Sequence, residues 1–301
     1  MSCVLLSCSS TSTVIAPPGV TASTAGAAST SGRPYLSRSF ITSSGAERHY
    51  LLRLPAGFGA SSCADVIFDF HGAGGTAEGE FDYTGFADLA DREGVILVHP
   101  DANKQYIDQQ HKLASYWNSA WEANLRERDY DVDFILELVA ALKSEFCIRS
   151  LYATGMSAGG DMVSALACLS DTPFASFAPV TYRYYNAPEC AGAAPRPIIS
   201  FQGDADQVVP IDGYGDPWFD PPIDEIMQRW ATHNQCDGGP IQERVGSEVV
   251  RYRWRSCEAD TEWYLIEGGG HTWPGGNPST TGSYVTQQIS ATELIWAFFK
   301  R

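Results

Sequence analysis

The chain has 301 residues, 44% hydrophobic and 12% aromatic, so it can bury one large core and is unlike a disordered protein over most of its length. Its formal net charge of −16 disfavours nucleic acids and anionic membranes, because both repel an acidic protein at long range. No run reaches the roughly 18 to 20 apolar residues that a membrane-spanning helix requires, so no membrane span is expected.

The cysteines and the first residues bear on the compartment. Eight cysteines are typical of a secreted protein, and none lies in a C-x-x-C or C-x-x-H pattern, so no metal site is expected. The opening MSCVLLSCSS fits a truncated leader, while its LLSC also resembles a lipoprotein cleavage box that would lipidate Cys8. Residues 9–33 are mostly small and polar and predict a flexible linker. We therefore expect a leader and linker over 1–33 and a single folded domain over 34–301.

From residue 48 onward, strand-like and helix-like runs alternate. Strands are predicted at 48–55, 65–72, 94–100, 151–155, 196–204, 248–255 and 262–271, and helices at 84–94, 131–147, 160–169, 223–236 and 291–300. The inner strands are continuous apolar runs, which favour a mostly parallel sheet covered by helices on both faces. The pattern predicts one doubly wound α/β domain, in which ligands bind beyond the carboxyl ends of the strands.

The segment SLYATGMSAGGDM, residues 150–162, contains a Gly-x-Ser-x-Gly motif centred on Ser157. The motif alone is a weak signal in a chain with 28 glycines. Its position between a predicted strand and a predicted helix is the context that exposes a nucleophilic serine on a sharp turn. The alternative is an ordinary tight loop with a capping serine. A serine nucleophile also needs a base and a group that orients the base.

The candidate base and acid lie downstream of Ser157. His271 follows a predicted strand in the glycine-rich EGGGHTWPGG, whereas His233 lies in an amphipathic helical run and suits a packing role. The segment FQGDADQVVPIDG offers three aspartates, each of which could also serve a turn. We take Asp206 as the acid, with Asp204 as its main rival and Asp212 as the third candidate.

An oxyanion requires two backbone N–H donors. One is the N–H of Ala158, which follows the nucleophile at a helix start, and the other is expected in HGAGG, residues 71–75, at Ala73. The same glycine-rich loop could cradle a phosphate, but it lacks the Lys-Ser/Thr pair and the G-x-G-x-x-G spacing of such loops.

Six blocks, HGAGGTA, WNSAW, YATGMSAGGDM, SALAC, GDADQVVP and EGGGHTWPGG, resemble those of secreted polyhydroxybutyrate depolymerase-like and feruloyl esterase proteins. The similarity is greatest to type C feruloyl esterases and covers roughly residues 48–301. The resemblance implies an α/β-hydrolase fold and a serine esterase. Carried over residue by residue, it places the nucleophile on Ser157, the acid on Asp206 and the base on His271.

The cysteines can be paired by topology. Cys63 and Cys147 precede two strands that are parallel neighbours in this fold, so they fall at the same sheet edge. Cys236 and Cys257 are close in sequence and form a second expected pair, which leaves Cys168 with Cys190 as the third.

Aromatic side chains are the candidates for substrate binding. Trp117, Trp121, Trp218 and Trp273 fall in loops expected on the catalytic side, where they either pack in the core or line a cleft for a phenolic acyl group or polymer chain. We take Trp117, Trp121 and Trp273 as candidate substrate-binding residues.

These patterns predict a secreted, monomeric carboxylic ester hydrolase that needs neither a metal nor an organic cofactor. Its expected partner is an ester on a polysaccharide or polyester, and we favour hydroxycinnamoyl esters of the plant cell wall. Polyhydroxybutyrate and acetylxylan are the alternative substrates. A non-catalytic carbohydrate-binding domain is the alternative of another class.

Overall fold

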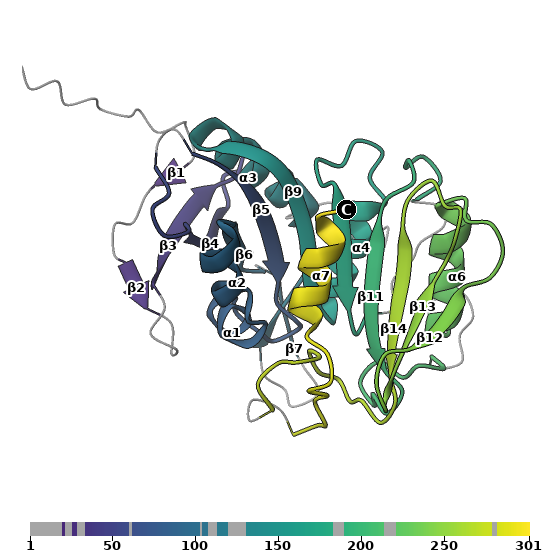
Figure 1. Cartoon of the computed structure of the whole chain (residues 1–301). Helices are drawn as coiled ribbons and strands as arrows, with labels where there is room; N and C mark the ends of the chain where they lie inside the picture. Colours follow the sequence, from purple (N-terminus) through teal and green to yellow (C-terminus); the bar gives the residue numbers. More distant parts are fainter. Residues whose placement is uncertain are drawn as a thin grey trace, which may run out of the picture.

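The structure of the chain, a computed structural model, describes residues 20–21, 26–28, 34–59, 62–102, 104–107, 113–119, 131–182, 190–213, 221–278 and 282–301. Nearly all described strands join one sheet in the order β1-β3-β4-β6-β5-β9-β10-β11-β14-β13-β12 (Figure 1). A separate pair consists of β7 (Lys104–Ile107) and β8 (Leu113–Tyr116).

The centre of the sheet is parallel and its margins are antiparallel. The parallel strands are β6 (Ile96–Pro100), β5 (Cys63–Phe70), β9 (Cys147–Met156), β10 (Ser176–Val180), β11 (Ile198–Gly203) and β14 (Thr261–Ile266). One margin holds β3 (Pro34–Ile41) and β4 (Glu47–Arg53), and the other β13 (Val249–Arg253) and β12 (Ile241–Arg244). This arrangement confirms the predicted mostly parallel α/β sheet.

Helices cover both faces of the sheet, because the fully buried inner strands present apolar side chains on both sides. One core packs against α3 (Asp131–Glu145), α4 (Ala158–Ala167) and α6 (Ile223–His233). The other packs against α1 (Ala77–Tyr83), α2 (Phe86–Glu93) and α7 (Ala291–Phe299), with α7 crossing in front of the sheet in Figure 1.

Two short strands lie in the segment expected to be linker. They are β1 (Val20–Thr21) and β2 (Gly26–Ala28), and both pair antiparallel with β3. The division at residue 33 stays a prediction, and Cys8 lies outside the described residues.

Three disulfides join the cysteines in the expected pairs. Cys63 bonds to Cys147 where β5 and β9 begin, at positions that are direct partners in the sheet register. Cys168 bonds to Cys190, and Cys236 bonds to Cys257.

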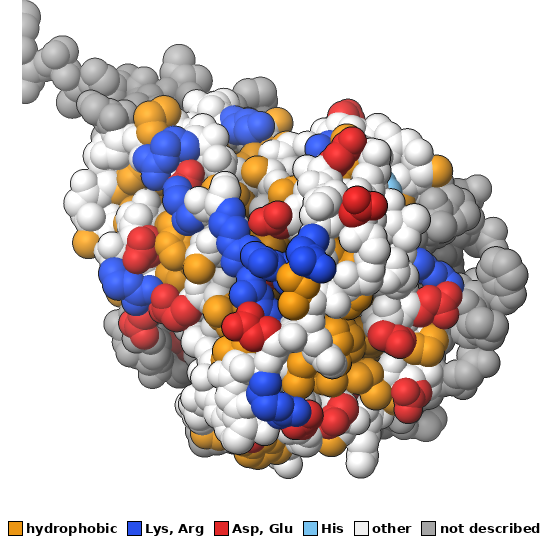
Figure 2. All heavy atoms as spheres, turned by 45° about the vertical axis from the view of Figure 1, so that its right-hand side comes forward, with side chains coloured by type: hydrophobic (Ala, Val, Ile, Leu, Met, Phe, Trp, Pro, Cys, Tyr) orange, Lys and Arg blue, Asp and Glu red, His pale blue; other side chains and the backbone are white. Residues whose placement is uncertain are grey.

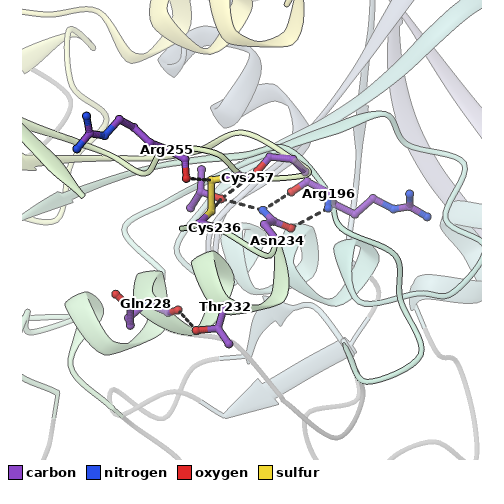
Figure 3. Close-up of a disulfide and its surroundings, with 9 residues drawn as sticks. Arg196, Gln228, Thr232, Asn234, Cys236, Arg255 and Cys257 are labelled. Carbon is purple, nitrogen blue, oxygen red and sulfur yellow. Dashed lines mark hydrogen bonds between the residues drawn. A yellow bond between two sulfur atoms is a disulfide. The ribbon is translucent and has the colours of Figure 1, made fainter. Parts of the chain in front are cut away.

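The third disulfide lies beside the starts of the two strands that lead to the candidate acid and base (Figure 3). Asn234, fully buried at the end of α6, donates from Nδ2 to Arg196 O at 2.7 Å and to Thr261 Oγ1 at 2.9 Å. Its Oδ1 accepts from Arg196 N at 2.9 Å. Because Arg196 precedes β11 and Thr261 opens β14, one side chain fixes the starts of both strands.

Charged side chains of both signs share the surface. On the face seen in Figure 2, basic side chains lie among acidic ones. Two buried carboxylates each receive two cations: Asp65 contacts Arg149 and Lys300, and Glu262 contacts Arg251 and Arg301. Within the described residues, no helix is long and apolar enough to cross a membrane.

Candidate active site

Ser157 occupies a strained turn between β9 and α4. Its φ of 56° and ψ of −123° are a conformation that non-glycine residues rarely adopt. The backbone N–H of Ser157 donates to Val180 O at 2.9 Å, and Ser157 O accepts from Asp161 N at 3.0 Å to begin α4. A strained serine between a strand and a helix is the geometry that lifts its hydroxyl above the sheet edge.

Close backbone packing explains the glycines around this turn. A Cβ on Gly155 would lie 2.7 Å from Phe70 O, and one on Gly159 would lie 2.0 Å from the same oxygen. The end of β5 therefore touches the start of α4 backbone to backbone. This contact also brings the loop after β5 beside the serine, since a Cβ on Gly72 would be 3.4 Å from Ser157 Cβ.

Asp206 and His271 come together from neighbouring strands. In the parallel pair of β11 and β14, Gly203 is opposite Ile266, so the two loops leave the sheet at the same edge. Backbone hydrogen bonds then join them, from Asp204 N to Ile266 O at 3.1 Å and from Ala205 N to Gly269 O at 2.9 Å. The distance from His271 Nδ1 to Asp206 Oδ2 is 2.8 Å.

Both carboxyl oxygens of Asp206 accept hydrogen bonds. Its Oδ1 accepts from the backbone N–H groups of Val208 and Val209, each at 2.8 Å, and its Oδ2 accepts from Gln202 Nε2 at 3.3 Å as well as from His271. Because a carboxylate only accepts, Nδ1 of His271 carries the hydrogen and Nε2 keeps its lone pair. The Asp206 side chain is fully buried, whereas that of His271 is 16% exposed.

The rival residues have other partners. Asp204 is exposed, and its Oδ1 accepts from the backbone N–H of Gly268 at 2.6 Å, so it fixes the turn before His271. Asp212 is exposed farther along the loop. His233 ends α6, with Nε2 3.2 Å from Ala194 O and its ring against Trp230, as expected for a packing role.

The loop that carries Ala73 is held by His71. The backbone N–H of Ala102 donates to His71 Nε2 at 3.1 Å, so Nδ1 must carry the hydrogen that it donates to Gly72 O at 2.7 Å. Gly72 O also accepts from Gly75 N at 3.0 Å. The peptide bond is planar and trans, so the N–H of Ala73 points opposite to this carbonyl, away from the hydrogen bonds that hold it.

Two of the candidate substrate-binding tryptophans, Trp117 and Trp273, are in the core, and this corrects the role expected for them. Trp117 is 1% exposed, meets the Phe70 ring edge to face and the His71 ring at a tilt, and donates from Nε1 to His71 O at 2.8 Å. Its indole can bury fully because that N–H finds an acceptor. Trp117 thus anchors the loop of Ala73 rather than contacting a substrate.

Trp273 is also packed inside, two residues after His271, and is fully buried. Its backbone N–H donates to Tyr83 Oη at 2.8 Å and its Nε1 to Thr292 Oγ1 at 3.0 Å, so it ties the His271 loop to α1 and α7. Trp121 and Trp218 lie outside the described residues. The sequence signal for this anchor was a tryptophan two residues after a histidine in a glycine-rich run.

A buried polar cluster lies behind the Ala73 loop, under α1. It comprises Asp69, Glu80, His99 and Thr84, with His99 Nδ1 3.7 Å from Asp69 Oδ2. Burial raises the pKa of Asp69 to about 8, although the Thr84 hydroxyl that donates to it at 2.7 Å opposes the rise. Burial also raises the pKa of Glu80 well above its usual value and lowers the pKa of His99 to about 3. Burial therefore favours the uncharged form of Asp69, Glu80 and His99, and sequence patterns did not indicate this cluster.

Comparisons with known proteins bear on the family. No family model matches the chain. The chain is 26% identical over 239 residues to feruloyl esterase B of Piromyces equi, covering 74% of this chain and 42% of that protein, so it matches less than half of that protein's length. It is 25% identical over 263 residues to feruloyl esterase C of Emericella nidulans, covering 84% of this chain and 83% of the relative.

Solved structures agree on the architecture. An acetyl xylan esterase from Aspergillus awamori superposes with a TM-score of 0.59 at 15% identity, over 75% of this chain and 89% of that one. The poly(3-hydroxybutyrate) depolymerase LpqC from Bordetella parapertussis gives a TM-score of 0.50 at 14% identity, over 79% and 85%. The sequence relatives and these folds confirm the resemblance and the α/β-hydrolase architecture.

Proposed function

We propose that the chain, a carboxylic ester hydrolase of the α/β-hydrolase fold related to feruloyl esterases, acts through Ser157, His271 and Asp206. The observation that carries the proposal is the 2.8 Å hydrogen bond between His271 Nδ1 and Asp206 Oδ2, made at the sheet edge where the strained Ser157 turn also lies. It leaves the lone pair of Nε2 as the base for the Ser157 hydroxyl.

In the first half of the reaction, Ser157 Oγ attacks the ester carbonyl carbon while its proton passes to His271 Nε2. The buried Asp206 carboxylate stabilises the imidazolium that forms and keeps it oriented. The proton then moves from Nε2 to the alcohol oxygen, the C–O bond breaks, and the alcohol departs. The acyl group remains as an ester on Ser157.

In the second half, water gives a proton to Nε2 as its oxygen attacks the acyl carbon. The proton returns to Ser157 Oγ as the acid leaves, which restores the enzyme. Both tetrahedral intermediates place negative charge on the former carbonyl oxygen. The N–H groups of Ala158, at the N-terminus of α4, and of Ala73 would stabilise that charge.

For the substrate, we favour hydroxycinnamoyl esters of plant cell-wall polysaccharide, because the sequence relatives are named feruloyl esterases. Methyl ferulate, acetylated xylan and a polyhydroxybutyrate suspension, compared side by side, separate this preference from its two alternatives. A rate on methyl ferulate at least tenfold above the others is the expected result. We further propose that the enzyme is secreted and monomeric, with its domain over residues 34–301; the three disulfides support secretion.

Ser157→Ala tests the nucleophile. We expect this variant to fold normally, since alanine fills less space, and to lose at least about 10³-fold in the rate of ester hydrolysis. Ser164→Ala, within α4, is a comparison for serine removal close to this turn and is expected to retain ester hydrolysis within a few fold. Hydrolysis at the wild-type rate by folded Ser157→Ala would refute the assignment and would favour a non-catalytic or differently catalysed domain.

A further inference from the structure

The loop that bears His271 is rich in glycine. Gly268, Gly269 and Gly270 precede the histidine, and Gly268 has a φ of +73°. Such a run has high conformational entropy when it is unrestrained. The hydrogen bond to Asp206 fixes one ring atom of His271, which leaves the ring free to tilt about that bond. The backbone on both sides of His271 must therefore be fixed by other groups.

Residues 282–290, which we call the strap, contact both flanks of His271. The carbonyl oxygen of Tyr284 accepts from Gly270 N at 3.3 Å and from Thr272 Oγ1 at 3.1 Å. One acceptor thus bonds the residue before and the residue after His271. The approach is close, because a Cβ on Gly270 would lie 2.6 Å from Ser283 Cβ. Farther along, Gly275 N donates to Thr286 O at 2.9 Å.

Glu248 attaches the strap to the sheet. Its carboxylate accepts from Tyr284 Oη, at 2.8 Å to each oxygen, and also from Thr286 Oγ1. Its backbone N–H donates to Gln288 Oε1 at 3.3 Å. Hydrogen bonds to a charged acceptor are stronger than those between neutral groups. Three residues of the strap are therefore bound by one glutamate.

The same glutamate is tied to the strand that leads to the histidine. Its carbonyl oxygen accepts from Glu267 N at 2.8 Å, directly after β14 ends, and β13 begins at the next residue and pairs with β14. Glu248 therefore connects the strap to the root of the His271 loop. The half-buried Glu248 and the 51% exposed Tyr284 lie at the surface, unlike the buried Trp273 anchor.

We propose that Glu248 is a positioning residue for His271. Its hydrogen bonds to Tyr284 and Thr286 hold the strap against both flanks of the histidine, and this keeps Nε2 directed at Ser157. The inference rests on the proposed triad. Without the carboxylate, the strap and the His271 loop move more freely and the productive orientation is populated for less of the time. The chemical step slows, while substrate binding is unchanged.

Three variants test this role. Glu248→Ala removes the acceptor, Glu248→Gln keeps an acceptor oxygen in place, and Tyr284→Phe removes the hydroxyl but leaves the backbone carbonyl that holds the flanks of His271. Glu243→Ala is the matched control, because it removes a carboxylate from β12 of the same hairpin, where Glu243 makes a 3.6 Å ion pair with Arg251. Activity on methyl ferulate is normalised to sites titrated with a fluorophosphonate, so misfolded protein does not count.

We expect Glu248→Ala to lower kcat per titrated site about tenfold with KM changed less than twofold. Tyr284→Phe should lower kcat about threefold, and Glu248→Gln should recover most of the loss, whereas Glu243→Ala stays within a factor of 1.5. Loss of folded protein lowers the number of titrated sites and leaves kcat per site unchanged.

Wild-type kcat per site in folded Glu248→Ala overturns the positioning role, as does a purely KM effect. If Glu248→Ala does not fold, Tyr284→Phe decides alone, and an unchanged kcat there overturns the role. Failure of the triad itself is recognised separately, because Ser157→Ala would then retain ester hydrolysis.

Discussion

The two sides of the proposed site are held by different forces. On the nucleophile side, Gly155 and Gly159 place the backbone of β9 and α4 directly against Phe70. On the histidine side, Gly203 also lies directly against the backbone of Gly269, but the loops beyond that contact are joined by hydrogen bonds and supported by the strap at the surface. An atom added to the close contacts around Ser157 has no space, whereas the hydrogen-bonded loops can lose one contact and adjust. A substitution that adds an atom on the nucleophile side should therefore prevent folding, and one that removes a hydrogen bond on the histidine side should lower the rate of hydrolysis.

Gly159→Ala is expected to have the largest effect. The new Cβ would lie 2.0 Å from Phe70 O and 2.6 Å from Phe70 C, both backbone atoms that cannot move without displacing β5. We expect a loss of about 4 kcal/mol or more in the free energy of unfolding, measured by urea denaturation, or no soluble protein. Gly192→Ala is the control, because nothing lies within 4 Å of its Cβ position. Equal stability of the two variants would contradict the packing argument.

Asp206→Asn should disrupt the orientation of His271 and lower kcat without unfolding the protein. The side-chain amide of asparagine has one oxygen, so it cannot accept from His271 Nδ1 and from the backbone N–H groups of Val208 and Val209 through two separate oxygens. The imidazole therefore loses its orientation and its charge partner. We expect kcat for methyl ferulate to fall about 10³- to 10⁴-fold. Asp204→Asn keeps an oxygen that can accept from Gly268 N, so its kcat should stay within fivefold of wild type. The reverse ranking would make Asp204 the acid.

Asp69→Asn tests the buried polar cluster of Asp69, Glu80, His99 and Thr84. With its pKa raised to about 8, folded Asp69 keeps its proton while the unfolded chain releases it near pH 4, so wild-type stability falls between those values as pH rises. The amide does not ionise. Relative to wild type, Asp69→Asn should therefore gain about 2 kcal/mol in unfolding free energy between pH 5.5 and 7.5. A pH-independent difference would show that Asp69 is ionised in the folded state.

Local sequence patterns predicted most of the inner sheet and its helices. The strand expected at 65–72 is β5, and the helix expected at 131–147 is α3. Strands with mixed patterns were not predicted. β10 contains Pro179, β3 alternates weakly and begins with proline, and α1 is short and largely polar.

For the site, the order of motifs along the chain indicated a segment with three aspartates and His271, and the resemblance selected Asp206, which bonds to His271. Motif order could not predict which residues hold the loops of Asp206 and His271 in place. Trp273 N bonds to Tyr83 across 190 residues, and Glu248 reaches Tyr284 across 36. Such contacts depend on how distant segments meet in space, and no local periodicity reports them. Trp117 and Trp273 were misassigned for the same reason, because a loop position indicates neither burial nor the partner of an indole N–H.

Mapping a covalent adduct is the most direct test of Ser157 as the nucleophile and His271 as its base. The wild-type enzyme and His271→Ala are treated with a fluorophosphonate, digested, and analysed by mass spectrometry over time. We predict one adduct, on Ser157 in the peptide that contains GMSAGG. In folded His271→Ala it should form at least 100-fold more slowly than in the wild type. An adduct on another residue, or equal rates at Ser157 in both proteins, would contradict the proposed pairing of serine and histidine.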